Sequence, residues 1–210
     1  MILNVVMLAV FPPTPVHENV PGFFNPVIGF ELASSPAHVF GILGEPGAPQ
    51  RSEAVRKMDR GNRIDFLFMA SYAALYAGIA LLLAARGRIP NGVAAILLAL
   101  AALMWLGDAL ENRELLYLSG VVEPDAMLGS LGRLRHFTIL KWHAIFGASA
   151  ISAPFIWREP GWWRWTAIFF GGAALVGFAS VAYLPAIEVS ALPLAVAWTM
   201  TWVHALMNTA

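Results

Sequence analysis

Long runs of apolar residues alternate with short polar stretches along most of this chain. A helix needs about 20 mostly apolar residues to cross a bilayer, and five runs reach or approach that length after residue 62. The predicted spans are residues 64–85, 92–117, 136–157, 162–184 and 189–207. Residues 185–188 are expected to form a tight connection between the last two spans. The alternative is one long, kinked helix over both runs.

Residues 1–62 have a different pattern and are predicted to form an N-terminal region, followed by a transmembrane helix bundle over residues 63–210. The first 50 residues contain no lysine or arginine and many of the prolines. Ser35 before Pro36 is typical of a helix N-terminus, so a short interfacial helix is expected at residues 37–43. The charged residues 50–62 are predicted to connect this region to the bundle.

Residues 1–11 are apolar but too few to span a bilayer as a helix. They lack the basic start and the small-residue cleavage site of a secretory signal. Two interpretations remain: an interfacial or packed segment at the true N-terminus, or the second half of a span that begins upstream.

Composition supports the membrane assignment. Of the 210 residues, 59% are hydrophobic and 12% are charged, whereas about a quarter are charged in soluble domains. The formal net charge is zero, so no basic excess indicates nucleic-acid binding. The absence of cysteine excludes disulfides, thiolate nucleophiles and cysteine-based metal sites. The sequence therefore predicts an all-α polytopic membrane bundle surrounded by lipid.

Lysine and arginine near the span ends favour one orientation. The side that precedes the first span has seven: Arg51, Arg56, Lys57, Arg60, Arg63, Arg133 and Arg135. The opposite side has four: Arg86, Arg88, Arg158 and Arg164. Because basic flanks stay in the cytoplasm, the first side is predicted to be cytoplasmic, in a bacterial inner (plasma) membrane. Tryptophans near residues 157–165 predict an aromatic belt at the other interface.

Ionisable and amide side chains from three spans are expected to meet near the cytoplasmic side. The predicted polar cluster consists of Asp65, Asp108, Glu111, Asn112, Lys141 and His143. Positions 108, 111 and 112 have the spacing i, i+3, i+4 and share one helix face. Charged groups within spans are costly, and they usually pair or mark a functional site.

Three carboxylates and one lysine leave two interpretations of this cluster. Lys141 pairs with the acids and fixes the helix register, or the cluster is a site for a substrate, proton or ion. A further alternative is that the helix ends earlier, which leaves these groups in headgroups or water. If all three acids ionise, two negative charges are left over. Either a carboxyl group is protonated, because burial and like charge favour the neutral form, or a cation helps to neutralise them: Arg113, His136, His143 or a metal ion. His136 and His143 are seven residues apart, too far for joint chelation, so no metal site is assigned. The cofactor is unknown.

Common catalytic motifs give no further guidance. The sequence has no P-loop, no G-x-G-x-x-G, no H-E-x-x-H and no G-x-S-x-G. Enzymatic activity is therefore left undecided.

Three short motifs support a resemblance. NPVIGFELASSP, GDALEN late in one span and LKWH early in the next resemble a group of uncharacterised bacterial multi-pass membrane proteins with D-x-x-E-N and L-K-W motifs. The resemblance covers most of the chain. It touches Asp108, Glu111, Asn112, Lys141, Trp142 and Glu31. It implies a membrane protein and names no substrate.

Three hypotheses from different classes follow. The first is a binding or transport protein whose acids hold a cation, a proton or a polar headgroup. The second is an intramembrane lipid-modifying enzyme with Glu111 or Asp108 as acid or base. The third is an accessory subunit of a larger membrane complex. A homo-oligomer is compatible with each of them.

Overall fold

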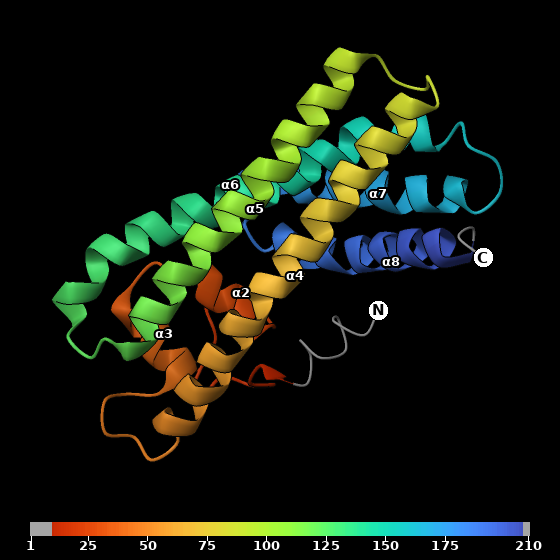
Figure 1. Ribbon diagram of the computed structural model, residues 1–210. Coiled ribbons are helices and arrows are strands. Elements are labelled where there is room, and N and C mark those ends of the chain that lie inside the picture. The colour runs from red at the N-terminus through yellow and green to blue at the C-terminus, as the bar shows by residue number, and fades with distance from the viewer. Residues whose placement is uncertain (1–9, 208–210) are drawn as a thin grey trace. The chain divides into compact units, whose positions relative to one another are not determined.

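The computed structural model describes residues 10–207, which form helices joined by short loops (Figure 1). The elements are α2 Pro26–Glu31, α3 Pro36–Leu43, α4 Arg51–Ala85, α5 Asn91–Gly120, α6 Pro124–Ile156, α7 Trp163–Phe178, η1 Ala179–Val181 and α8 Ala186–Met207. The structure is 78% helix. Within the described part of the chain, five helices are long and apolar enough to cross a membrane: α4, α5, α6, α7 with η1, and α8. The predicted all-α fold with five spans is confirmed.

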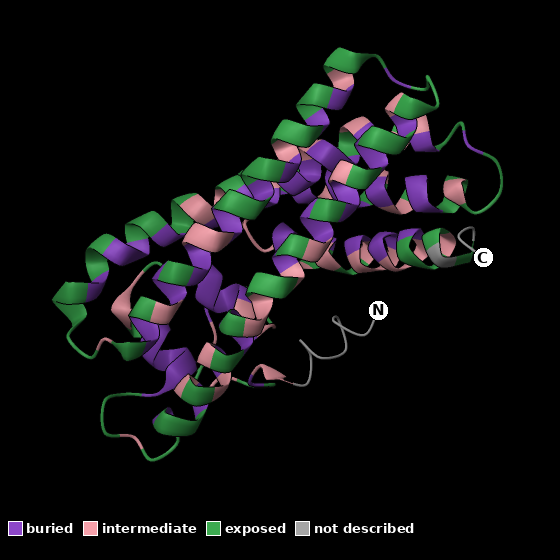
Figure 2. Ribbon diagram, viewed as in Figure 1, coloured by how far each residue is buried: buried purple, intermediate pink, exposed green. Residues whose placement is uncertain are grey.

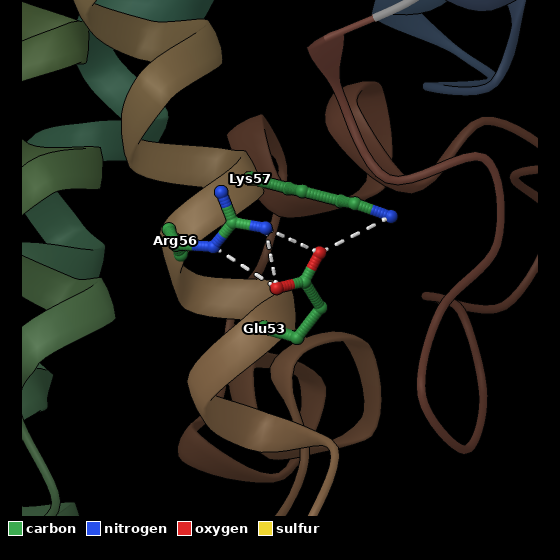
Figure 3. Close-up of polar contacts among 3 residues, drawn as sticks. All are labelled: Glu53, Arg56 and Lys57. Atoms are coloured by element: carbon green, nitrogen blue, oxygen red, sulfur yellow. Dashed lines mark hydrogen bonds and ion pairs between the residues drawn. The ribbon is translucent and has the colours of Figure 1, made fainter.

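Helix α4 begins earlier than the sequence indicated. Residues 51–62, predicted as a connector, form its first turns. Glu53 accepts hydrogen bonds from Arg56 at 2.6 Å and lies 3.5 Å from Nζ of Lys57 (Figure 3). Such i, i+3 and i, i+4 pairs stabilise a helix, and an acid in the first turn complements the helix dipole. A charged stretch is therefore helical here without being apolar.

Helix α6 also begins before its predicted start at residue 136. It starts at Pro124, a residue type favoured at the first helical position. Met127, Ser130, Leu131 and Leu134 are buried, whereas residues 128, 129, 132 and 133 are exposed. The first turns are thus amphipathic, and an apolar run alone does not reveal them.

The last two spans are separate helices. Helix α7 continues into η1, which ends at Val181, and α8 begins at Ala186. Helices α7 and α8 contact each other, so the alternative of one long kinked helix is wrong. The tight connection lies at residues 182–185, slightly earlier than predicted.

The short N-terminal helices follow the capping chemistry of their first residues. The Ser35 side chain accepts the His38 N–H at 3.3 Å, and Pro36 is the first residue of α3. Asn25 accepts the Val27 N–H at 2.8 Å in the same way at α2. The expected helix is confirmed. Its interfacial location and the domain boundary after residue 62 stay predictions, and most of residues 1–11 lie outside the described part.

The chain forms two compact units. Among the described residues, unit 1 contains residues 70–105 and 141–207, and unit 2 contains residues 10–69 and 106–140. Each unit has its own buried residues, shown in purple in Figure 2. Helices α4, α5 and α6 contribute residues to both units.

Inside unit 1, one tyrosine joins three helices through hydrogen bonds. Tyr76 of α4 is buried, and its hydroxyl lies 2.5 Å from Oγ of Ser149 on α6. Nε1 of Trp198 on α8 donates to the same hydroxyl at 3.4 Å. The Trp198 ring also stacks on Tyr72 with centroids 5.2 Å apart. This contact set fixes α4, α6 and α8 in one register.

We expect Tyr76→Phe to lower the free energy of unfolding by about 1–2 kcal/mol, because Ser149 loses its partner in a dry environment. Unfolding in mixed detergent micelles, followed by circular dichroism, measures the change. Tyr183→Phe is the control, since Tyr183 is exposed. Equal stabilities of the two variants would contradict a structural role for the Tyr76 hydroxyl.

Candidate functional site

Two hydrogen bonds join α4 to α5 inside unit 2. Nδ2 of Asn112 donates to Oδ2 of Asp65 at 2.7 Å. Oγ of Ser119 donates to Oδ1 of Asp59 at 2.5 Å. The contact nearer the start of α4 lies nearer the end of α5, so the two segments run antiparallel. The structure brings together two residues, Asp65 and Asn112, that the sequence placed in one cluster.

The polar face of α5 is buried, as predicted from its spacing. Its members are Asp108, Glu111, Asn112 and Leu115, with 2%, 0%, 1% and 1% of their surface exposed. The two positions between them, residues 109 and 110, are half-buried, and Arg113 is exposed. Asp65, Asp108 and Glu111 all interact with other groups of the protein. Burial of charged carboxylates without partners is costly, so such contacts are expected.

Asn62 is a member of this region that the sequence did not reveal. It lies on α4 between Asp59 and Asp65, and only 1% of its surface is exposed. Its Nδ2 has no hydrogen-bond partner among the described residues. The sequence hid it because residues 50–62 were interpreted as a connector, although its i, i+3 spacing to Asp65 is the signal that could have found it.

We call this set the acidic seam. It consists of Asp59, Asn62 and Asp65 on α4 together with Asp108, Glu111, Asn112 and Ser119 on α5. Every member belongs to unit 2. Carboxyl groups beside amides and a hydroxyl can accept and release a proton.

Glu114 is a further buried acid of α5, and its hydrogen bonds give it a structural role. Its carboxylate accepts from Oγ of Ser130 at 2.6 Å and from Nε and Nη2 of Arg133 at 3.0 and 2.9 Å. The bidentate arginine contact and the hydroxyl satisfy both oxygens. Glu114 therefore joins α5 to α6. This role was not predicted, because charge spacing along one helix does not show partners on the next.

Lys141 and His143, the other two predicted cluster residues, belong to unit 1. Lys141 is buried, and its Nζ lies 5.3 Å from the ring centre of Trp142. His143 is half-buried, with its ring 6.1 Å from those of Phe146 and Phe178. Their participation in one site with the acidic seam stays a prediction.

Neither a metal site nor a similar known protein indicates the function of this chain. Among the described residues, no group of three or more His, Asp or Glu side chains could hold a metal ion. The chain matches no family model, no curated protein and no solved structure. The resemblance to bacterial multi-pass proteins and the inner-membrane location therefore stay predictions, while the five apolar helices support a multi-pass membrane protein.

Proposed function

We propose that this is a multi-pass membrane protein whose acidic seam takes up and releases a proton, with Glu111 as the main acceptor. The observation that carries the proposal is the complete burial of the Glu111 side chain, at 0% exposure, beside Asp108 at 2%. Burial disfavours the charged form of a carboxyl group. We therefore assign the proton to Glu111, the most deeply buried acid of the seam.

The amide side chains of the acidic seam can hydrogen-bond to its carboxyl groups in both the ionised and the protonated form. Asn112 donates to Asp65 at 2.7 Å, so one carboxylate of the seam has a fixed donor. Asn62 adds a buried Nδ2 that has no hydrogen-bond partner in residues 10–207. A rotated carboxyl group or a water molecule can accept from this nitrogen when the proton arrives or leaves. Asn62 thus supplies the acidic seam with an additional N–H donor.

Ligand size favours a proton over the other candidates. The Glu111 side chain has no exposed surface, so a lipid substrate or a headgroup reaches it only if the helices separate. A proton moves along hydrogen bonds and needs no cavity. The burial therefore supports proton binding above the lipid-modifying enzyme.

Infrared spectroscopy of purified protein across a pH series tests the proposal. Glu111→Gln preserves the shape and removes the titrating group. We expect the wild type to show a carboxylic-acid C=O band that changes with pH and shifts in heavy water, and we expect Glu111→Gln to lose it. Asp125→Asn is the control, because Asp125 is exposed in the first turn of α6.

The possible outcomes distinguish a proton-binding site from acids that only hold the helices together. A titrating band that persists in Asp125→Asn and disappears in Glu111→Gln supports the proposal. A folded wild type without any such band, at every pH tested, means that the acids remain ionised and only hold the helices together. Asp108→Asn serves as a second variant if Glu111→Gln does not fold, and retention of the full band in both variants contradicts the proposal.

A further inference from the structure

One end of unit 1 carries four arginines and one glutamate, Glu159. Arg86 and Arg88 follow α4, Arg158 follows α6, and Arg164 lies in the first turn of α7. Buried Glu159 lies 3.3 Å from Nη1 of Arg86 and 2.9 Å from Nε of Arg88. Arginine stays protonated in proteins, so these five side chains have a formal charge of +3.

An apolar hollow adjoins Arg86 and Glu159. Its lining includes Leu82, Leu83, Ile156 and Trp163, together with Arg86 and Glu159. The lining residues come from α4, from α6, from the start of α7 and from the loop between α6 and α7. The hollow therefore has an apolar wall and a cationic rim.

Tryptophans mark this end as a membrane interface. Trp157, Trp162 and Trp165 are exposed, and they lie within a few residues of Glu159 in the chain. Tryptophan is enriched at the level of the lipid headgroups, where its ring meets the acyl chains and its N–H meets water. Leu82, on the wall of the hollow, is partly exposed as well.

We propose that Arg86 and Arg88, with this hollow, form a binding site for an anionic phospholipid. The phosphate lies between the two guanidinium groups, and an acyl chain lies against the exposed side chain of Leu82 beside the hollow. The side chains of Arg86 and Arg88 are 49% and 50% exposed, so N–H donors beyond the Glu159 contact face outward. Guanidinium groups bind phosphate oxygens in a bidentate manner.

Glu159 contacts both guanidinium groups but neutralises only one of the four positive charges at this end. A purely structural ion pair needs one arginine for one glutamate, whereas Glu159 contacts both Arg86 and Arg88, and Arg158 and Arg164 lie close to it in the chain. Charge complementarity thus selects an anionic headgroup, and the apolar wall selects a lipid over a soluble phosphate.

The test uses the full-length protein purified in a neutral detergent with a mixture of phosphatidylglycerol and phosphatidylcholine. Native mass spectrometry measures the ratio of the two lipids retained per protein. We expect the wild type to retain phosphatidylglycerol preferentially. Arg86→Gln with Arg88→Gln should lower this preference roughly thirtyfold, the factor expected for two arginine–headgroup contacts.

The control removes the same charge elsewhere. Arg60→Gln with Arg135→Gln changes two exposed arginines of unit 2 and should keep the preference. Glu159→Gln covers the case in which the double variant does not fold. It frees both guanidinium groups from a competing carboxylate, so we expect it to strengthen phosphatidylglycerol retention.

Three results overturn the proposal. The first is equal retention of the two lipids by the wild type. The second is an equal loss of preference in both arginine double variants, which means that only overall charge matters. The third is an unchanged or weaker preference for phosphatidylglycerol in folded Glu159→Gln, which means that the ion pair has only a structural role. Inorganic phosphate, added in excess, should displace little lipid, because it lacks the acyl chain.

Discussion

Arg51→Ala is expected to lower the free energy of unfolding by about 3 kcal/mol, because it removes a buried guanidinium group that donates several hydrogen bonds. The guanidinium donates to the carbonyl of Gly44 at 2.5 Å, of Ser119 at 3.2 Å and of Val121 at 3.1 Å. It also lies 5.6 Å from the ring centre of Phe40. One side chain therefore joins the end of α3, the start of α4 and the end of α5.

The carbonyls explain the size of this effect. Gly44 caps α3, and Ser119 lies in the last turn of α5, where helix carbonyls have no partner within the helix. Removing the guanidinium leaves these acceptors without a donor in a place that is shielded from water. Arg51→Lys retains the charge but loses the planar fork, so we expect a loss between those of alanine and the wild type.

Denaturation in mixed micelles, followed by circular dichroism, measures the free energy of unfolding of these variants. Arg56→Ala is the control, because Arg56 is exposed and pairs only with Glu53 in the contacts described above. Exposed pairs of this kind contribute little to stability because water screens them. A loss in Arg51→Ala no larger than that in Arg56→Ala would show that the three carbonyls are hydrated or find other donors.

Gly177→Ala is expected to lower the free energy of unfolding by about 1–3 kcal/mol through overpacking. A Cβ atom at residue 177 on α7 would overlap the Phe146 ring of α6. Phe146 has 0% exposure and packs against the rings of Trp142 and Phe178, with centroids 5.8 and 5.9 Å away. The ring has no free direction in which to move.

The same substitution five residues earlier should have the opposite sign. Nothing lies within 4 Å of a Cβ atom at Gly172, which is also on α7 and exposed. Alanine favours a helix over glycine by about 1 kcal/mol, so Gly172→Ala should stabilise the protein. The contrast separates helix propensity from packing.

A double-mutant cycle checks the named contact. Phe146→Leu alone should destabilise the protein, but combined with Gly177→Ala it should recover part of the loss, since the smaller side chain accommodates the methyl group. Additive effects in the cycle would mean that Phe146 is not the obstacle. Equal signs for Gly177→Ala and Gly172→Ala would contradict the close approach of α7 to α6.

The helices of this protein follow from local sequence information. Apolar runs of sufficient length predict the five spans, and Ser35 before Pro36 predicts the start of α3. The i, i+3, i+4 spacing of Asp108, Glu111 and Asn112 predicts one face, which is buried in the structure. In each case the signal lies within a few turns of one helix.

Helix starts in charged stretches were less predictable. Residues 51–62 carry many charges, so hydropathy indicates a connector, yet the Glu53 pairs and the buried Met58 and Asn62 make them part of α4. Hydropathy averages over all faces of a helix. It therefore misses helices with one buried and one solvated face.

The sequence by itself determined that the chain is an all-α protein with five spans and an acidic face on α5. Only the tertiary structure decided that Asn112 donates to Asp65, that Arg51 reaches carbonyls about 70 residues away in the chain, and that Gly177 meets Phe146. The physical reason is the range of the interactions. Spans and faces arise from periodicity along one helix, whereas these contacts depend on the register between helices, which side-chain packing sets and no local pattern records.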